Sequence, residues 1–394
     1  MSPRAQLRCY GAGQNFFWQL SGTPDAPRRA DTPVRLEWLE AMRPSALACG
    51  GHFSYAVSER DGGAVFRWGT DNGRVIPAPE RVGLPHEAIE VFGSGGKQRR
   101  AVAVACGAKH TLILLDGGLV LGTGVGYFGQ LGCGDDASSS EPRIIKALSP
   151  GSLGGGGASG SGGGDDRVVS VAAGGLHSGC LTKAGGVYMW GFNRSGQCGV
   201  GGKNRSTISS PVPIDGSEEL RACGRPLQLV CGRHHSSLLT EGALLRSQAR
   251  DCFFFKKMLP ATDKILQALL LRSMWRLLHA LVRARLCRAR LFRALLPGGA
   301  VFSWGATSFG RLGIHDLSEK KTSSPKRVTT LDHFAVHAIA AGDFHMLALT
   351  RDRRVFSWGY GAEGQCGHGS ALHLRTPRPI DALKHVLVSK ISCG

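Results

Sequence analysis

Residues 173–178 read AGGLHS and residues 187–191 read VYMWG, and this pair of phrases recurs along the chain. The first phrase returns in related form at residues 105–111, 230–236 and 341–345, and the second at residues 301–305 and 355–359. Self-similarity at a regular spacing means that one structural unit is built several times over. The fold must therefore be derived for the unit first.

Each unit holds four strand-length runs separated by turns. In one unit an apolar run ends at Gly107, a second run follows His110, and a turn at residues 116–118 leads into a third run. A tight loop comes next, reading GQLG at 129–132, GQCG at 196–199, GRLG at 310–313 and GQCG at 364–367. A proline-flanked run then closes the unit, as suits an outer edge strand. Four strands per unit, repeated radially, predict an all-β fold of the β-propeller type.

The Cys-Gly-x-x-His, Trp-Gly and Gly-Gln-Leu-Gly phrases resemble those of the regulator of chromosome condensation repeat family, whose members are seven-bladed propellers. The resemblance covers nearly the whole chain outside two insertions. It implies one propeller domain over residues 1–394. It is specific for the fold and much less so for function, because one fold hosts many functions.

The unit count departs from that family. The Gly residues that open units are Gly50, Gly107, Gly174, Gly232, Gly342 and Gly394. The chain starts and ends inside a unit, so we count five full units plus two half units. Pooling the halves gives six blades, and the chain is interpreted as a partial or truncated propeller, or a six-bladed departure. Phe53 stands where His is expected, and Leu121-Gly122 where Trp-Gly is expected.

The recurrent residues are interpreted as a structural framework. Besides the opening glycines it comprises His110, His177, His235 and His345, and Trp68, Trp190, Trp304 and Trp358. Each histidine occupies the same place in a different unit, so the four do not converge on a metal or substrate. We expect each to hydrogen-bond the strands of its own blade. No catalytic residue, metal or cofactor is predicted, and the chain is not expected to be an enzyme.

The formal net charge of +19 is concentrated in one insertion. Residues 243–298 hold 12 Lys/Arg and 2 Asp, which contributes +10, and they interrupt a hairpin. Their apolar residues recur at helical spacing beside a basic stripe made of Arg272, Arg276, Arg283 and Arg290. Three interpretations stay open: a helix that contacts chromatin, an anionic membrane or a partner groove, a helix packed on the propeller, or translated intron. A second insertion, residues 149–166, predicts a flexible Gly/Ser loop.

The N-terminus has no apolar signal region, and the 12 cysteines include no Cys-x-x-Cys pair. We therefore expect a cytoplasmic or nuclear protein without a transmembrane segment. The predicted function is a non-catalytic scaffold that binds another protein and has no small-molecule substrate. The alternative that the resemblance implies is a guanine-nucleotide exchange factor for a Ran-like small GTPase, associated with chromatin. A similarity to the plant UV-B photoreceptor carries no function here, because the Trp of its Gly-Trp-Arg-His-Thr phrases is missing.

Overall fold

The computed structural model describes residues 10–14, 29–71, 73–89, 99–149, 152, 166–201, 205–214, 216–242, 299–315 and 319–393. The predicted helix over 243–298, with its four stripe arginines, lies outside these residues, as does most of the predicted loop over 149–166. Both stay predictions. No helix in the described part of the chain is long and apolar enough to cross a bilayer.

Five four-stranded antiparallel sheets, here called blades 1 to 5, make up the fold. The strands are β3 (Pro44–Cys49), β4 (Phe53–Ser58), β5 (Ala64–Asp71) and β6 (Arg74–Arg81) in blade 1; β7 (Ala101–Cys106), β8 (His110–Leu115), β9 (Val120–Gly124) and β10 (Ser139–Ile144) in blade 2; β11 (Val168–Ala173), β12 (His177–Thr182), β13 (Val187–Phe192) and β14 (Thr207–Pro213) in blade 3; β15 (Pro226–Cys231), β16 (His235–Thr240), β17 (Val301–Ala306) and β18 (Lys321–Arg327) in blade 4; and β19 (Val336–Ala341), β20 (His345–Thr350), β21 (Val355–Gly359) and β22 (Leu374–Pro379) in blade 5. This confirms the predicted all-β propeller architecture and its five full units.

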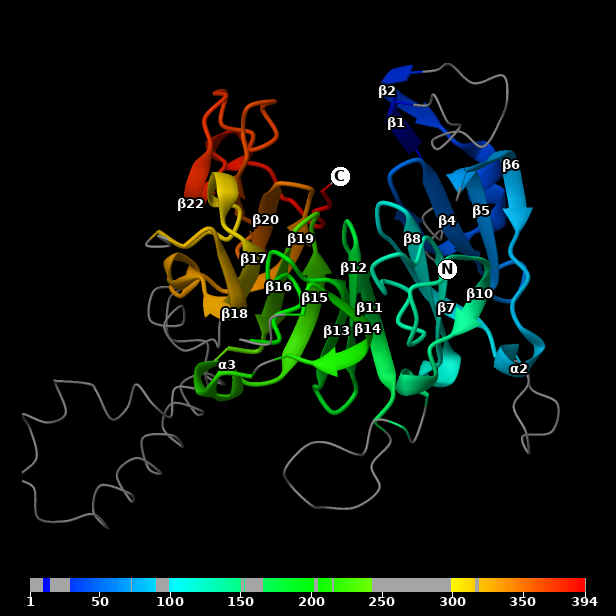
Figure 1. Cartoon of the computed structure of the whole chain (residues 1–394). Helices are drawn as coiled ribbons and strands as arrows, with labels where there is room; N and C mark the ends of the chain where they lie inside the picture. Colours follow the sequence, from blue (N-terminus) through cyan, green and yellow to red (C-terminus); the bar gives the residue numbers. More distant parts are fainter. Residues whose placement is uncertain are drawn as a thin grey trace, which may run out of the picture.

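The blades stand side by side along an arc (Figure 1). A two-stranded sheet of β1 (Tyr10–Gln14) and β2 (Arg29–Arg35) lies beyond blade 1 and supplies the N-terminal half unit. The predicted C-terminal half unit contains no strand at its end, because residues 388–393 have no regular secondary structure. Cys393 nevertheless lies against the backbone of Gly342 and Leu347 at the edge of blade 5. Among the described residues, α1 (Glu37–Met42) precedes blade 1, and α2 (His86–Ile89) and α3 (Glu218–Ala222) connect successive blades.

Strand register corrects one prediction. His177 pairs with Gly191 and Ser178 with Trp190, whereas in blade 2 His110 pairs with Gly124 and Thr111 with Thr123. The Trp-Gly position of blade 2 is therefore Thr123-Gly124, two residues later than the predicted Leu121-Gly122. The third run of blade 2 has Gly at both 122 and 124 and has no Trp, so its composition could not reveal the register.

The recurrent Gly before each histidine is required by close packing. A Cβ placed on Gly107 would lie 2.3 Å from Cε1 of His110 and 2.3 Å from the carbonyl oxygen of Gly174 in the next blade. Gly174 meets His177 and Gly232 at nearly the same distances, each 2.4 Å. Any side chain at these positions would push the histidine and the neighbouring blade apart. The Gly of the Cys-Gly-x-x-His phrase is therefore required by the close spacing between neighbouring blades.

The core lies within and between the sheets. The second strands β4, β8, β12 and β16 are buried along their whole length, so the Ser, Thr and His residues within them are buried together with the apolar ones. Trp68, Trp190, Trp304 and Trp358 are the largest fully buried side chains in the described residues. Each lies in a third strand. Trp190, Trp304 and Trp358 contact the tight loop of the preceding blade, whereas Trp68 packs against Trp38.

The hairpin that carries the insertion is already closed at its base. The amide of Thr240 donates to the carbonyl of Ala300 at 2.9 Å, as Thr182 does to Gly186 and Leu115 does to Leu119. In those two hairpins three residues form the turn. Counting Glu241, Gly242 and Gly299 gives the same three-residue turn, once residues 243–298 are left out. The insertion therefore enters at one peptide bond of an otherwise regular hairpin.

We predict that joining Gly242 directly to Gly299 leaves the propeller folded. The resulting Glu-Gly-Gly turn matches Asp116-Gly117-Gly118 of blade 2, and Gly242 already has φ of 87°. Thermal unfolding should remain cooperative, with a midpoint within about 3 °C of the intact chain.

A control deletion extended through Ala300 removes the carbonyl that accepts from Thr240 and should lower the midpoint clearly. Loss of cooperative unfolding in the shorter deletion would show that residues 243–298 pack on the propeller.

Candidate functional site

The framework histidines link successive blades. Nε2 of His110 lies 2.8 Å from Oγ of Ser178 in the next blade, and that hydroxyl donates to the carbonyl of Gln130 at 2.8 Å. Because the hydroxyl proton is committed to Gln130, Nε2 of His110 must carry the proton that it donates to Ser178. Nε1 of Trp190 donates to the same carbonyl at 2.9 Å. The loop of one blade therefore holds two side chains of the next.

The link recurs one blade further along. His177 contacts Oγ of Ser236 at 2.8 Å, and Ser236 and Trp304 donate to the carbonyl of Gln197 at 2.9 and 2.8 Å. We expected each histidine to bond the strands of its own blade, and for these rings that was wrong. The turn before the second strand projects the ring across the junction, where the next blade supplies the hydroxyl.

These histidines are neutral. Burial lowers the pKa of His110 from 6.5 to about 4 and that of His177 to about 3. The described residues contain no group of three His, Cys, Asp or Glu side chains that could hold a metal ion.

The junction between blades 4 and 5 breaks this pattern. The residue after His345 is Met346, where Ser178 and Ser236 stand in blades 3 and 4. His235 is 0% exposed, and neither ring nitrogen has a hydrogen-bond partner. In the loop of blade 4, Arg311 occupies the place of Gln130 and Gln197. Two of the residues that link blades elsewhere are thus replaced at one junction.

Arg311 changes the loop around it. In the other loops the glutamine Oε1 accepts from the amide two residues earlier, Phe128 N or Ser195 N, each at 2.9 Å. Arginine has no acceptor, and Phe309 instead adopts a φ of 62°, in the left-handed region. Side chains with a Cβ adopt that conformation at a cost of about 1–2 kcal/mol. Among the described residues Arg43 and Arg353 also have a left-handed φ, but of the three only Phe309 stands in a loop where the repeat pattern is broken.

An aromatic–arginine cluster surrounds this loop. We use that name for Arg233, Phe309, Arg311, Asp343, Phe344, Tyr360 and His373. The Phe309 ring makes edge contacts with Tyr360 and His373, both at 5.0 Å between centroids, and Tyr360 stacks on His373 at 4.8 Å. The guanidinium of Arg311 lies 4.9 Å from the Phe344 ring. Phe309 is 43% exposed, so the cluster reaches the surface.

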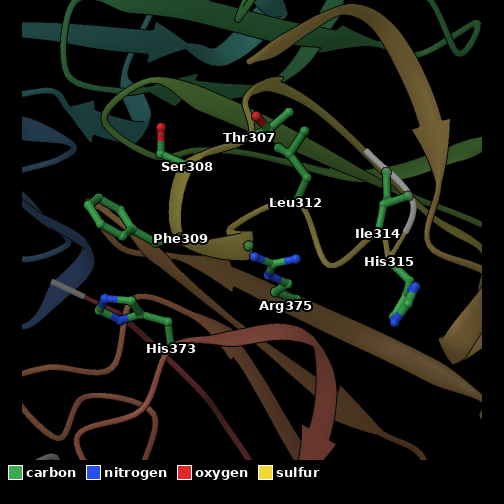
Figure 2. Close-up of a pocket in the computed structure, with 9 residues that line it drawn as sticks. Thr307, Ser308, Phe309, Leu312, Ile314, His315, His373 and Arg375 are labelled. Atoms are coloured by element: carbon green, nitrogen blue, oxygen red, sulfur yellow. The ribbon is translucent and has the colours of Figure 1, made fainter. Parts of the chain in front are cut away.

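A pocket of about 560 Å³ adjoins the cluster (Figure 2). Figure 2 shows Phe309 and His373 on one side, Ile314 and His315 on the other, and Arg375 between them. The loop of blade 4 and the segment before β22 of blade 5 supply this lining. Leu312 and Ile314 give it an apolar wall, and the two histidines and Arg375 give it a polar one.

None of the cluster residues was predicted as a site. The framework residues were found because they repeat, whereas the cluster consists of residues that do not. A signal was present in the sequence: Arg311 stands in a glutamine position and Met346 in a hydroxyl position. Comparing the units for their differences at these two positions would have pointed to this junction.

Fold and site together define a repeat propeller in which buried hydrogen bonds link successive blades and in which the irregular junction between blades 4 and 5 carries surface aromatic and arginine residues. The Regulator of chromosome condensation (RCC1) repeat matches residues 117–181, 184–239, 298–349 and 352–394. A second form of the same repeat matches residues 101–130, 168–197 and 336–365. The chain belongs to the regulator of chromosome condensation repeat family.

Curated relatives fall in several functional classes. The chain is 30% identical over 390 residues to the E3 ubiquitin-protein ligase HERC2 of Homo sapiens, which covers 98% of this chain and 7% of the ligase. It is 28% identical to the Ultraviolet-B receptor UVR8 of Arabidopsis thaliana, over 92% of this chain and 75% of the receptor. Among solved structures, Prp20p of Saccharomyces cerevisiae superposes with a TM-score of 0.67 at 18% identity, over 99% of this chain and 77% of that protein. The last likeness shows the fold alone.

We predict that the buried histidines make stability fall as the pH drops below about 6.5. The unfolded chain protonates His110 near pH 6.5, whereas the folded chain does so only near pH 4. The unfolded state therefore binds more protons in this window, and one such histidine removes roughly 2 kcal/mol of stability by pH 5. Urea denaturation of a His110→Gln variant at pH 7.5 and pH 5 should show a correspondingly smaller loss.

His333→Gln changes an exposed histidine and is the matched control. An equal pH dependence in wild type and both variants would show that His110 is not protonated differently in the two states.

Proposed function

We propose that this chain is a non-catalytic scaffold that binds another protein through the aromatic–arginine cluster. The observation that carries the proposal is the coincidence of strain, broken repeat pattern and exposed aromatic residues at one junction. Aromatic and arginine side chains supply most of the binding energy in protein interfaces. Natural proteins depart from local rules mainly where function requires it.

The buried hydroxyls support a non-catalytic role. In the part of the chain that the structure describes, three serines lie within hydrogen-bond reach of a histidine: Ser178, Ser236 and Ser357. All three are 0% exposed and donate to a main-chain carbonyl, as Ser357 does to Cys366 at 2.6 Å. A nucleophile needs a free proton acceptor and access to substrate, and these hydroxyls have neither.

The Phe309→Ser substitution tests the proposal. Phe309 is partly exposed at a strained position, so its loss should leave the fold intact and remove a contact residue. We expect the tagged variant to capture a defined set of proteins from cell extract at least about fivefold less than wild type, as loss of an interface aromatic predicts. Quantitative mass spectrometry of the captured proteins measures this.

Val75→Ser is the matched control, because Val75 is 49% exposed in β6, far along the arc. An identical set of proteins captured by wild type and both variants would place the binding surface elsewhere.

The alternative function is guanine-nucleotide exchange on a Ran-like small GTPase. The structure of Prp20p is described with its binding to Gsp1p and histones, and the shared propeller fold motivates the same assay here. A scaffold should leave the rate of labelled-GDP release from Ran unchanged within about twofold at micromolar protein, a difference of less than about 0.5 kcal/mol. Acceleration by catalytic amounts of the chain would establish the alternative instead.

A further inference from the structure

Arg311 holds a buried positive charge that the protein only partly satisfies. The residue is 3% exposed, and its Nε donates to the carbonyl of Ser308 at 2.9 Å. Its Nη1 is buried without a hydrogen-bond partner among the described residues. Burial lowers the pKa of Arg311 to about 10. An unpaired buried charge is costly, and a bound anion would offset that cost.

The surrounding charges do not balance. Two guanidinium groups lie close to the Phe344 ring, that of Arg311 at 4.9 Å and that of Arg233 at 5.5 Å from the ring centroid. The one carboxylate in the cluster, Asp343, pairs with Arg233 at 3.5 Å. Arg375 adds a further cation in the adjoining pocket. The cluster therefore lacks at least one negative charge.

The fold does not require arginine at this position. Gln130, Gln197 and Gln365 occupy it in the other complete loops, and each accepts from the amide two residues earlier. Glutamine also avoids the left-handed conformation that Phe309 adopts. Arginine here thus costs folding free energy, which implies a contribution outside the fold.

We propose that the aromatic–arginine cluster binds an acidic peptide segment of a partner protein, with one carboxylate anchored by Arg311 and Arg233. This rests on the proposed scaffold function and adds the chemistry of the partner. Guanidinium groups bind carboxylates by charge-assisted hydrogen bonds. The pocket lined by Leu312, Ile314 and His373 takes an apolar side chain next to the acidic residue.

A peptide fits this surface better than a nucleic acid does. Nucleic acids bind to rows of exposed cations that follow the phosphates. Here the main cation, Arg311, is buried, and Arg233 is already paired with Asp343. One buried guanidinium beside an apolar pocket matches a single carboxylate with an apolar neighbour.

The test is selection of a displayed random decapeptide library on the immobilised full chain. We expect the selected peptides to be enriched in Asp or Glu next to an apolar residue. The best peptide, labelled with fluorescein, should lose at least about tenfold in affinity when its acidic residue becomes the matching amide, about 1.4 kcal/mol. Fluorescence polarisation measures both peptides.

Variants of the chain assign the contact. Arg311→Gln restores the residue of the other loops, should fold with an equal or higher thermal midpoint, and should bind acidic and amide peptides equally. Arg233→Gln changes a 51% exposed residue and gives the same comparison without touching the core. Arg60→Gln, an exposed arginine in the hairpin between β4 and β5, removes the same charge and should change nothing.

The proposal is overturned if no peptide is selected, if acidic residues are not enriched, or if both Arg311→Gln and Arg233→Gln retain the preference. It is also overturned if a single-stranded 12-mer DNA binds more tightly than any peptide and Arg311→Gln abolishes that binding. The scaffold function has a separate readout. If Phe309→Ser loses captured proteins while the library shows no acidic preference, the surface binds a partner of other chemistry.

Discussion

A main-chain carbonyl in the tight loop of one blade joins it to the next blade, and this carbonyl belongs to Gln130, Gln197 or Arg311. The Gln130 carbonyl accepts from Ser178 and Trp190, and the hydroxyl of Ser178 in turn accepts from His110. All of these groups are buried, where a missing partner costs roughly 1–3 kcal/mol. Since each blade contacts mainly its neighbours, the stability of the arc depends on how well each junction is made. The recurring residues of the sequence are the residues that make this contact.

Because stability depends on the junctions between blades, the residues that form these junctions recur, and the sequence predicts the fold from them. Gly107 and Gly174 recur because a Cβ at either position would clash with a histidine ring and with the next blade. The spacing between blades can therefore be inferred from the repeated glycines in the sequence. Strand number and order follow from the same repeats. The predicted direction of the histidine bonds was wrong, because the unit was treated as self-contained. Ser178 lies next to His110 only after blades 2 and 3 have packed, and no local pattern shows that packing.

The cluster was harder to predict for a related reason. Its residues come from the turn before β16, the loop after β17, the turn before β20 and the segment after β21, and they meet only where blades 4 and 5 face each other. Periodicity selects residues that are alike, and these differ from their counterparts. Only Arg311 and Met346 carry a visible signal, because their positions are defined by the units that keep Gln and Ser.

The two unusual features of the chain affect its stability differently. The insertion at residues 243–298 enters at a hairpin turn, and the bonds on either side of it, from Thr240 to Ala300 and from Gly299 to Val336, are intact. The insertion does not alter the hydrogen bonds to the main-chain carbonyl that joins neighbouring blades. The fold therefore tolerates the length of the insertion. Arg311 and Met346 act on that contact itself. They leave His235 without a partner, strain Phe309 and bury a charge, while Trp358 still donates to the Arg311 carbonyl at 3.0 Å. The bond from Trp358 to the main-chain carbonyl is therefore kept between blades 4 and 5. The side-chain hydrogen bonds that the Gln, Ser and His residues make elsewhere are replaced by groups that stabilise the fold less. A junction altered in that selective way is explained most directly by a ligand that supplies the missing interactions.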